Sequence, residues 1–549
     1  MASTNTRSVH FMRVMALALA LAGAPGAVAH DQDHAPPWTP APVAASAAHA
    51  PTPLPDRVVL SWNDDPRTTQ SVTWRTDTSI VRAVAEIAVA NANGRALRPR
   101  RVDAATQAFS SDLNDAHYHS VTFRDLAPDT LYAYRVGDGV NWSEYFHFRT
   151  ASHRPQPFSF IYFGDAQNDI KTHWSRVFRE AFRDAPRAAF TLHAGDLINE
   201  DARDAEWGAW HHAPAWVNGT VPVIATPGNH EYYRADPGPG NERYWNTADG
   251  GHIAVDVEEA LQRAPDGAER VTLSARIGDG TTATLVYDED DQILTVSPEV
   301  SKLTGFSAEE LLGTDYDRKP LDDRRRDPGE PRVSDHWRPQ FAFPVYDELP
   351  VALAETVYYI DYQGARIISL DSNRDRELQI PWLRRVLEDN PNRWTIITFH
   401  HPIFSPASDR DNAELRAMWK PLFDEFRVDM VLNGHDHTYA RTGDLSGTVV
   451  TGNVPSGYQQ AYDPAIGTVY VVSVSGPKMY DISKGTYARR VAEDTQLYQI
   501  IEVHDSELVY RAYTATGRLY DAFTLEKRHG AANVLREVLP PENRSPAPR

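Results

Sequence analysis

Five short hydrophobic segments of this chain each end directly before residues that commonly bind metal ions. These residues are, in chain order, Asp165, Asp196, Asn229 with His230, His400, and His435 with His437. Short apolar runs bounded by turn residues are typical of buried β-strands, and α/β sheets carry their functional groups at the carboxyl ends of such strands. A single case has little weight, because a buried Asp at a strand end often caps the next helix. Five cases in sequence predict that these side chains meet at one edge of a sheet and bind metal.

The donor atoms restrict which metals can bind. The six candidate ligands supply only oxygen and nitrogen: Asp165, Asp196, Asn229, His400, His435 and His437. The chain has no cysteine, and this mixture suits Fe, Mn or Zn better than Ca or Mg. One catalytic ion that keeps open positions cannot use six protein ligands, so we expect two ions that share a bridging carboxylate. Two ions about 3.5–4 Å apart would hold the attacking and leaving oxygens of an in-line displacement.

Residues 1–29 have the pattern of an export signal. Arg7 and Arg13 supply positive charge before an apolar run at residues 14–22. A small-residue cleavage sequence ends at Ala29. The run is too short to span a membrane, and no later stretch qualifies. We therefore expect a periplasmic or extracellular protein after cleavage near Ala29. The formal net charge of −20 argues against a nucleic-acid backbone or an anionic membrane as partner, whereas a metal pair would still attract a small phosphorylated substrate.

A length of 549 residues predicts two or three domains. Residues 30–55 are rich in Pro and Ala and are expected to form a linker. Residues 56–152 contain short alternating strands broken by turns, which is typical of a β-sandwich. Residues 153–525 alternate strands with helical segments, which indicates βαβ units and a largely parallel central sheet. Residues 526–549 are expected to form a C-terminal tail.

Within the α/β region, amphipathic patterns predict helices in three places, at residues 172–183, 378–388 and 413–426. Residues 251–335 interrupt the alternation of strands and helices and are expected to form a small α+β insertion with a hairpin of 270–277 against 281–287. Residues 291–313 resemble the opening of a PAS sensor domain, but too little chain follows Gly313 to complete that fold. A small α+β insertion with capped helices and no ligand is therefore the favoured interpretation.

The ordered motifs resemble those of a known enzyme family. Gly-Asp, Gly-Asp, Gly-Asn-His-Glu, His-x-Pro and Gly-His-Asp-His end the five segments and are similar to the motifs of the calcineurin-like metallophosphoesterases. Residues 126–132 resemble the tyrosine corner of fibronectin type III sandwiches, and a preceding sandwich makes the bacterial purple acid phosphatase-like proteins the nearest subgroup. The resemblance covers residues 56–525 apart from the insertion. It implies a fibronectin III-like β-sandwich followed by an α/β domain of two packed mixed sheets flanked by helices.

The resemblance also implies a role for each candidate residue. The six ligands divide between two metals, with Asp165 and His437 on the first, Asn229, His400 and His435 on the second, and Asp196 bridging them. His230 would contact the phosphate or protonate the leaving group.

Two positions depart from the family pattern. Asn199 stands where purple acid phosphatases have the tyrosine that ligates ferric iron, so we expect no tyrosinate ligand and a colourless enzyme. The family often has substrate-facing histidines shortly after His-x-Pro. Residues 405–412 contain none and offer Asp409, Arg410 and Asp411 instead. The family's details of specificity therefore do not transfer to this chain.

The expected reaction is hydrolysis of phosphate monoesters by a metal-bound hydroxide, since coordination lowers the pKa of water from about 15.7 toward 7. General-acid help from His230 would add about 10²–10⁴-fold. A phosphodiesterase or nucleotide hydrolase is an open alternative, because it would use the same ligands. The third alternative is a non-catalytic ligand-binding or sensing protein, against which the complete ligand set argues. The pattern does not predict an oligomeric state.

Overall fold

The structure is a computed structural model. It describes residues 42–540 except for short gaps at 235–241, 250, 264–268, 277–280, 289–290, 316–320, 322–323, 326–330, 409, 446–454, 483–486 and 539. The predicted export signal at residues 1–29 lies outside the described residues. Among the helices that are described, none has both the length and the apolar character needed to cross a bilayer.

The N-terminal domain is a β-sandwich of two antiparallel four-stranded sheets, as predicted. One sheet has the order β1 (Asp56–Ser61), β2 (Gln70–Thr76), β6 (Asp115–Phe123) and β5 (Ala105–Ser110). The other has the order β4 (Arg100–Asp103), β3 (Val84–Val89), β7 (Leu131–Gly137) and β8 (Phe146–Arg149). Apolar side chains from both sheets, such as Trp74 and Tyr134, fill the space between them. The backbone N–H of Ala127 donates to the Tyr132 hydroxyl at 2.8 Å, which fixes the corner before β7.

The α/β domain contains two seven-stranded mixed sheets, which confirms the predicted architecture. The first has the order β11 (Val223–Ala225), β10 (Thr191–His193), β9 (Phe158–Phe163), β27 (Leu497–Val503), β28 (Glu507–Thr514), β29 (Leu519–Glu526) and β30 (Val534–Glu537). The second has the order β20 (Tyr358–Tyr362), β21 (Ala365–Ser369), β22 (Trp394–Thr398), β23 (Met430–Asn433), β25 (Val469–Val472), β24 (Tyr439–Arg441) and β26 (Arg490–Ala492). β9 to β11 are parallel, as are β21, β22, β23 and β25.

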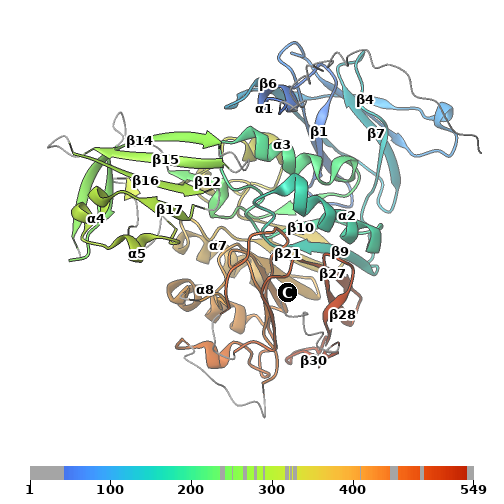
Figure 1. Cartoon of the computed structure of the whole chain (residues 1–549). Helices are drawn as coiled ribbons and strands as arrows, with labels where there is room; N and C mark the ends of the chain where they lie inside the picture. Colours follow the sequence, from blue (N-terminus) through green and yellow to red (C-terminus); the bar gives the residue numbers. More distant parts are fainter. Residues whose placement is uncertain are drawn as a thin grey trace, which may run out of the picture. The chain divides into compact units, whose positions relative to one another are not determined.

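Helices cover the outer faces of the two sheets (Figure 1). They are α2 (Ser175–Asp184) and α3 (Asp204–His212) beside the first sheet, and α7 (Ile380–Glu388) and α8 (Ala413–Glu425) beside the second. Successive strand residues point to opposite faces. Ile396 of β22 therefore joins the core between the sheets, whereas Ile397 packs with α7 and α8. The three predicted helices are confirmed. α2 begins later than predicted because Ile170–Trp174 forms a π-helical turn, and a short α6 (Trp337–Gln340) precedes β20.

The insertion is an antiparallel six-stranded sheet with its own apolar core. Its strand order is β17 (Ile293–Val296), β16 (Thr282–Asp288), β15 (Glu269–Arg276), β14 (His252–Arg263), β13 (Glu242–Asn246) and β18 (Arg324–Arg325). Two helices contribute to that core, α4 (Pro298–Thr304) and α5 (Ala308–Leu311), and β12 (Tyr232–Arg234) pairs with β19 (Pro331–Val333) at the base. The predicted hairpin is confirmed as β15 and β16. In the chain, β13 to β16 precede β17, and β18 follows it. The sheet is therefore completed mainly by residues before β17 and not by the chain after Gly313.

Both predicted terminal segments contain regular structure. α1 (Ala45–Ala48) lies inside the range predicted as a linker. β30 lies inside 526–549, the range predicted as a tail, and pairs with β29. Leu535 of β30 packs against the main core, and the Asn533 side chain donates to Asp429 Oδ1 at 2.6 Å. The tail prediction is corrected accordingly, because four residues suffice for an edge strand when a neighbouring strand supplies its partners.

Candidate metal centre

The five predicted strands are β9, β10 and β11 of the first sheet and β22 and β23 of the second. Their carboxyl ends meet, as two backbone contacts show. The His435 N–H donates to both carboxylate oxygens of Asp165 at 2.9 and 2.8 Å, across 270 positions of sequence. The His230 N–H donates to Asp196 Oδ1 at 3.0 Å. The structure therefore brings all the predicted strand-end residues to one edge between the two sheets.

Two groups of ligand atoms share Asp196. One group consists of Asp196, His400 and His435, and the other consists of Asp165, Asp196 and His437. Within each group the ligand atoms lie within 4.8 Å of one another. The amide of the sixth predicted ligand joins the first group, because Asn229 Oδ1 lies 3.0 Å from His400 Nε2. A carboxylate common to both groups occupies the position that a bridging ligand requires.

The buried carboxylates of this centre fit cationic ligands. Asp165 is fully buried and Asp196 is 1% exposed. Among the described residues their ion pairs are with histidines, His437 Nε2 at 3.5 Å from Asp165 Oδ1 and His400 Nε2 at 3.0 Å from Asp196 Oδ2. Burial raises the pKa of Asp165 well above its usual value. Two adjacent buried carboxylates are stable as anions when a cation lies between them, so this donor set fits a pair of metal ions.

Hydrogen bonds determine which nitrogen of two histidines is free to bind metal. His400 Nδ1 donates to the Ala194 carbonyl at 2.9 Å, and His437 Nδ1 donates to the Lys478 carbonyl at 3.0 Å. A carbonyl oxygen only accepts, so both Nδ1 atoms carry the proton and both Nε2 atoms are available. Burial by itself lowers the pKa of His400, but the nearby Asp196 carboxylate raises that pKa to about 9. A metal at Nε2 would take the place of that proton.

Close backbone packing explains the glycines that precede the ligands. Gly195 has a φ of +90°, and a Cβ there would lie 2.6 Å from His400 Nδ1. A Cβ on Gly228 would lie 2.0 Å from Asp196 Oδ1. The ligands are also held in the left-handed region, with φ of 50° at Asp196 and 75° at His435. Backbone strain of this kind persists where the surrounding structure enforces it.

Glu231 belongs to the Gly-Asn-His-Glu motif, but no role for it was predicted from the sequence. Its fully buried carboxylate accepts the backbone N–H groups of Asp196 at 2.9 Å, Leu197 at 2.7 Å and Gly228 at 2.7 Å. Glu231 therefore joins the loop after β10 to the loop after β11. Burial raises its pKa to about 8. One sequence signal could have indicated this role. Glu231 stands three positions after Gly228, which is the spacing of a helix capping box.

His230 lies at the rim of the centre and is only partly buried. Its Nδ1 donates to the Asn199 carbonyl at 2.5 Å, so Nε2 is the nitrogen left for other chemistry. Burial lowers the pKa of His230. The position where the family has tyrosine therefore contributes a backbone carbonyl that orients His230.

Arg410 is the residue of the segment after His-x-Pro that contacts the metal centre. Its Nη1 donates to the His435 carbonyl at 3.1 Å and to Asp436 Oδ1 at 3.2 Å. Asp411 instead pairs with an arginine of α8 at 2.5 Å, and Asp409 lies outside the described residues. Of the three charged residues predicted to replace histidines here, Arg410 is the one that the structure places beside a ligand.

Lys478 provides a second cation, which no sequence motif indicated. Its carbonyl holds His437. Both His437 and His230 have lowered pKa values, chiefly because they are buried, and the Lys478 ammonium contributes to both shifts. Tyr480 stacks on the His437 ring at 4.5 Å between centroids, and the Arg410 guanidinium lies 4.6 Å from the Tyr480 ring. The Tyr480 ring therefore contacts both His437 and Arg410, while the Lys478 backbone holds the His437 ring.

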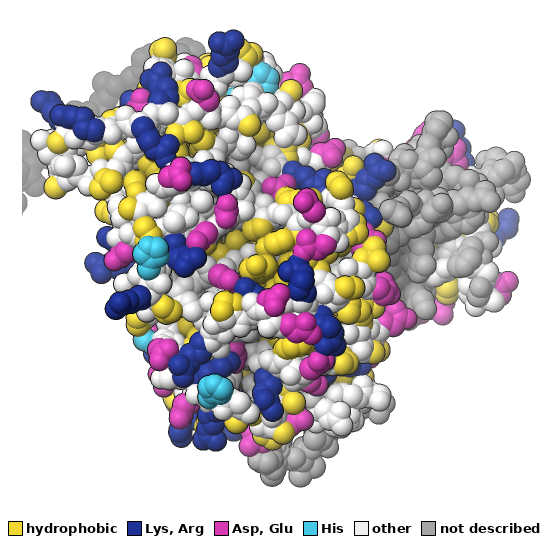
Figure 2. Space-filling model, turned by 180° about the vertical axis from the view of Figure 1, so that it is seen from behind, with side chains coloured by type: hydrophobic (Ala, Val, Ile, Leu, Met, Phe, Trp, Pro, Cys, Tyr) yellow, Lys and Arg dark blue, Asp and Glu magenta, His cyan; other side chains and the backbone are white. Residues whose placement is uncertain are grey.

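A hollow of about 1080 Å³ lies at the opposite edge of the sheets. It is lined by segments that precede β9, β21 and β22, including residues 155–157 and 391–393. Ligands of α/β sheets bind at the carboxyl ends of the strands, so the metal centre is the better candidate active site. On the face in Figure 2, basic and acidic side chains are interspersed around apolar ones.

Comparison with known proteins agrees with this geometry. The N-terminal domain model of purple acid phosphatases matches residues 55–150. The calcineurin-like phosphoesterase model matches residues 158–341 and 320–439. The chain belongs to the calcineurin-like phosphoesterases. The resemblance stated from the motifs is thus confirmed, and the chain also has the N-terminal domain of the purple acid phosphatases.

Individual relatives of this chain are distant. An uncharacterized Mycobacterium tuberculosis protein is 37% identical over 76 residues, 13% of this chain and 14% of that protein. Probable inactive purple acid phosphatase 1 of Arabidopsis thaliana is 21% identical over 437 residues, 75% of this chain and 58% of that protein. The chain thus spans less than two thirds of these relatives. The purple acid phosphatase PPD1 of yellow lupin (Lupinus luteus) seeds shares the fold, with a TM-score of 0.57 at 16% identity, covering 86% of this chain and 74% of the lupin chain.

Proposed function

We propose that this phosphoesterase is an exported, dinuclear-metal phosphatase that hydrolyses phosphate monoesters. The observation that carries the proposal is the Asp196 carboxylate common to two ligand groups. When bound, two ions would supply an activated water and neutralise the phosphoryl oxygens. Export is supported by the signal-like pattern of residues 1–29.

His230 is suited to protonate the leaving oxygen. The bond from Nδ1 to the Asn199 carbonyl holds the ring, so a protonated His230 presents its second N–H from Nε2. Transfer of that proton breaks the Nε2–H bond and forms the O–H bond of the product alcohol. A positioned general acid contributes about 10²–10⁴-fold.

Arg410 and Lys478 favour a monoester over a diester. A phosphate monoester carries two negative charges near neutral pH, whereas a diester carries one and places a second organic group beside the phosphorus. Arg410, beside the His435 carbonyl, and the Lys478 ammonium, which contributes to the lowered pKa values of His230 and His437, would stabilise the extra charge electrostatically.

The direct test compares p-nitrophenyl phosphate with bis(p-nitrophenyl) phosphate and measures metal content alongside. We expect a higher kcat/KM for the monoester. Asp196→Asn should lose both paired metals and activity. His230→Ala should keep the metals and lose turnover of a monoester whose leaving group has to be protonated, such as glycerol phosphate. Absence of turnover with either ester in fully metal-loaded protein would favour a non-catalytic binding protein.

Lys478→Met tests the source of the preference. The ratio of monoester to diester kcat/KM should fall by about tenfold or more, as expected when a transition-state contact worth about 1.4 kcal/mol or more is lost. Lys302→Met is the matched control, because Lys302 is an exposed lysine on α4 of the insertion. An unchanged ratio in Lys478→Met would remove Lys478 from substrate recognition.

A further inference from the structure

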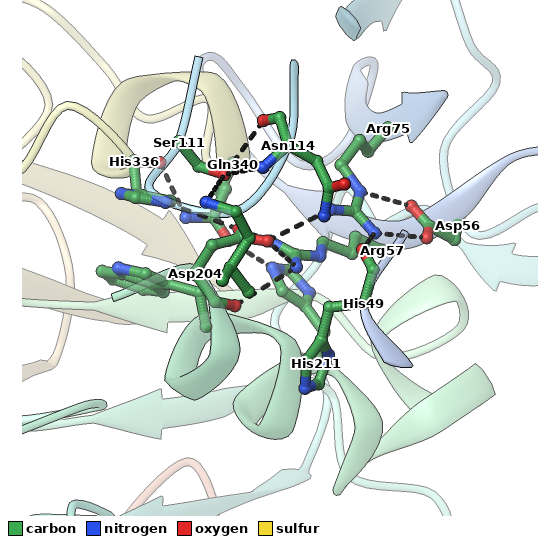
Figure 3. Close-up of polar contacts among 12 residues, drawn as sticks. His49, Asp56, Arg57, Arg75, Ser111, Asn114, Asp204, His211, His336 and Gln340 are labelled. Carbon is green, nitrogen blue, oxygen red and sulfur yellow. Dashed lines mark hydrogen bonds and ion pairs between the residues drawn. The ribbon is translucent and has the colours of Figure 1, made fainter. Parts of the chain in front are cut away.

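A buried ion pair ties the β-sandwich to the start of α3 (Figure 3). Arg57 of β1 donates twice to Asp204, the first residue of α3, from Nη1 to Oδ1 at 2.6 Å and from Nη2 to Oδ2 at 2.9 Å. Arg75 of β2 lies 3.4 Å from the same carboxylate, and Asp112 of the sandwich accepts the Asp204 N–H at 2.9 Å. The Arg57 and Asp204 side chains are 3% and 2% exposed. The sandwich therefore fixes the N-terminal turn of α3.

The backbone of Arg57 is strained where it makes this contact. Its φ is 49°, at a register shift between Asp56 and Val59 in the pairing of β1 with β2. A β-bulge redirects side chains and is over-represented next to active sites. A non-glycine residue held at positive φ costs free energy unless its contacts compensate. The pairing with Asp204 is the contact that holds Arg57 in this conformation.

The same turn of α3 holds the loop that orients His230. Glu206 Oε2 accepts the backbone N–H groups of Asn199 at 2.6 Å and Glu200 at 3.0 Å. The carbonyl of Asn199 in turn accepts the Nδ1–H of His230 at 2.5 Å. A continuous set of contacts thus runs from the sandwich through Asp204 and Glu206 to the ring of His230.

We propose that Glu206 is a positioning residue for His230 and that the Arg57–Asp204 pair makes the sandwich part of the catalytic apparatus. This inference rests on the proposed function, in which His230 gives its Nε2 proton to the leaving oxygen. Without Glu206 the Asn199 peptide loses the acceptor that fixes its position, and the carbonyl no longer aims the imidazole. A misplacement of about 1 Å from a change away from the chemistry can cost about 10²-fold.

The test uses two monoesters that differ in their leaving group. The nitrophenolate of p-nitrophenyl phosphate leaves without a proton, whereas the alkoxide of glycerol phosphate has to be protonated. In Glu206→Ala and Arg57→Met, kcat for glycerol phosphate should fall about 10- to 100-fold, with little change for p-nitrophenyl phosphate and no change in metal content. Glu206→Gln keeps an acceptor oxygen and should restore most of the loss.

Arg135→Met is the matched control for the sandwich. Arg135 pairs with Glu86 at 2.8 Å within the second sandwich sheet, so its loss should leave both rates unchanged. Equal losses with the two substrates in Glu206→Ala, or unchanged rates, would overturn the inference. Glu206 is 19% exposed on a helix, so its variants decide the question even where Arg57→Met does not fold.

His230→Ala in the same assay separates this inference from the proposed function. If His230→Ala does not discriminate between the leaving groups, the acid role itself is wrong. If it discriminates and the Glu206 and Arg57 variants do not, only the positioning inference is wrong.

Discussion

Replacing Glu231 by Gln should weaken both the fold and the metal centre. In the native protein Oε2 accepts from Asp196 and Gly228, and Oε1 accepts from Leu197 and, at 3.3 Å, from Ile198. A glutamine has one acceptor oxygen, so two buried N–H groups lose their partner whichever way the amide is turned. Each unsatisfied buried donor costs about 1–3 kcal/mol, which gives about 2–6 kcal/mol in total.

The cost should divide between two measurements. Urea unfolding of the metal-free protein above pH 8, where Glu231 is ionised because its pKa is about 8, reports the loss of folding free energy. Chelator competition reports metal affinity, which we expect to fall about 10–100-fold, as for other residues that support metal ligands indirectly. Glu86→Gln, a buried carboxylate of the sandwich, is the control and should leave metal affinity unchanged. A Glu231→Gln protein with native unfolding and native metal affinity would refute the reasoning.

Three further predictions concern stability and colour. Asp521→Ala should lower the free energy of unfolding by about 1–3 kcal/mol in a urea titration, because the fully buried Arg441 loses a 2.7 Å contact between the two sheets and keeps Glu537 as a carboxylate partner; an unchanged midpoint would contradict this. Burial lowers the pKa of His119 to about 4, below its value near 6.5 in the unfolded chain. The unfolded chain therefore takes up a proton first as the pH falls. About 3 kcal/mol of the free energy of unfolding, fully present above pH 6.5, is lost as the pH falls toward 4. His119→Gln should flatten this part of the pH–stability curve. The holoenzyme should show no tyrosinate absorption band in its visible spectrum, because Asn199 replaces tyrosine.

The candidate metal ligands could be selected from the sequence because their signal is local. Each of Asp165, Asp196, Asn229, His400 and His435 follows a short buried strand, and the carboxyl ends of parallel strands share one edge. The strand type, the residue type and the position are therefore all visible within a few residues of sequence.

The supporting residues could not be predicted because their roles depend on distant packing. Lys478 contacts the centre only because the chain after β25 passes His437. Glu206 and Arg57 carry no motif, and the pair with Asp204 joins residues 147 positions apart. The PAS-like stretch at 291–313 looked incomplete in the sequence because most strands of its sheet precede it in the chain. The strand β30 could not be predicted from its own residues because it depends on pairing with β29.

The most direct measurement is anomalous X-ray diffraction from crystals of the metal-loaded protein, recorded at the absorption edges of Fe, Mn and Zn. The account predicts two metal peaks per chain, about 3.5–4 Å apart, with the Asp196 carboxylate bound to both. A single peak, or a pair of peaks with Asp196 outside the coordination of either ion, would contradict it.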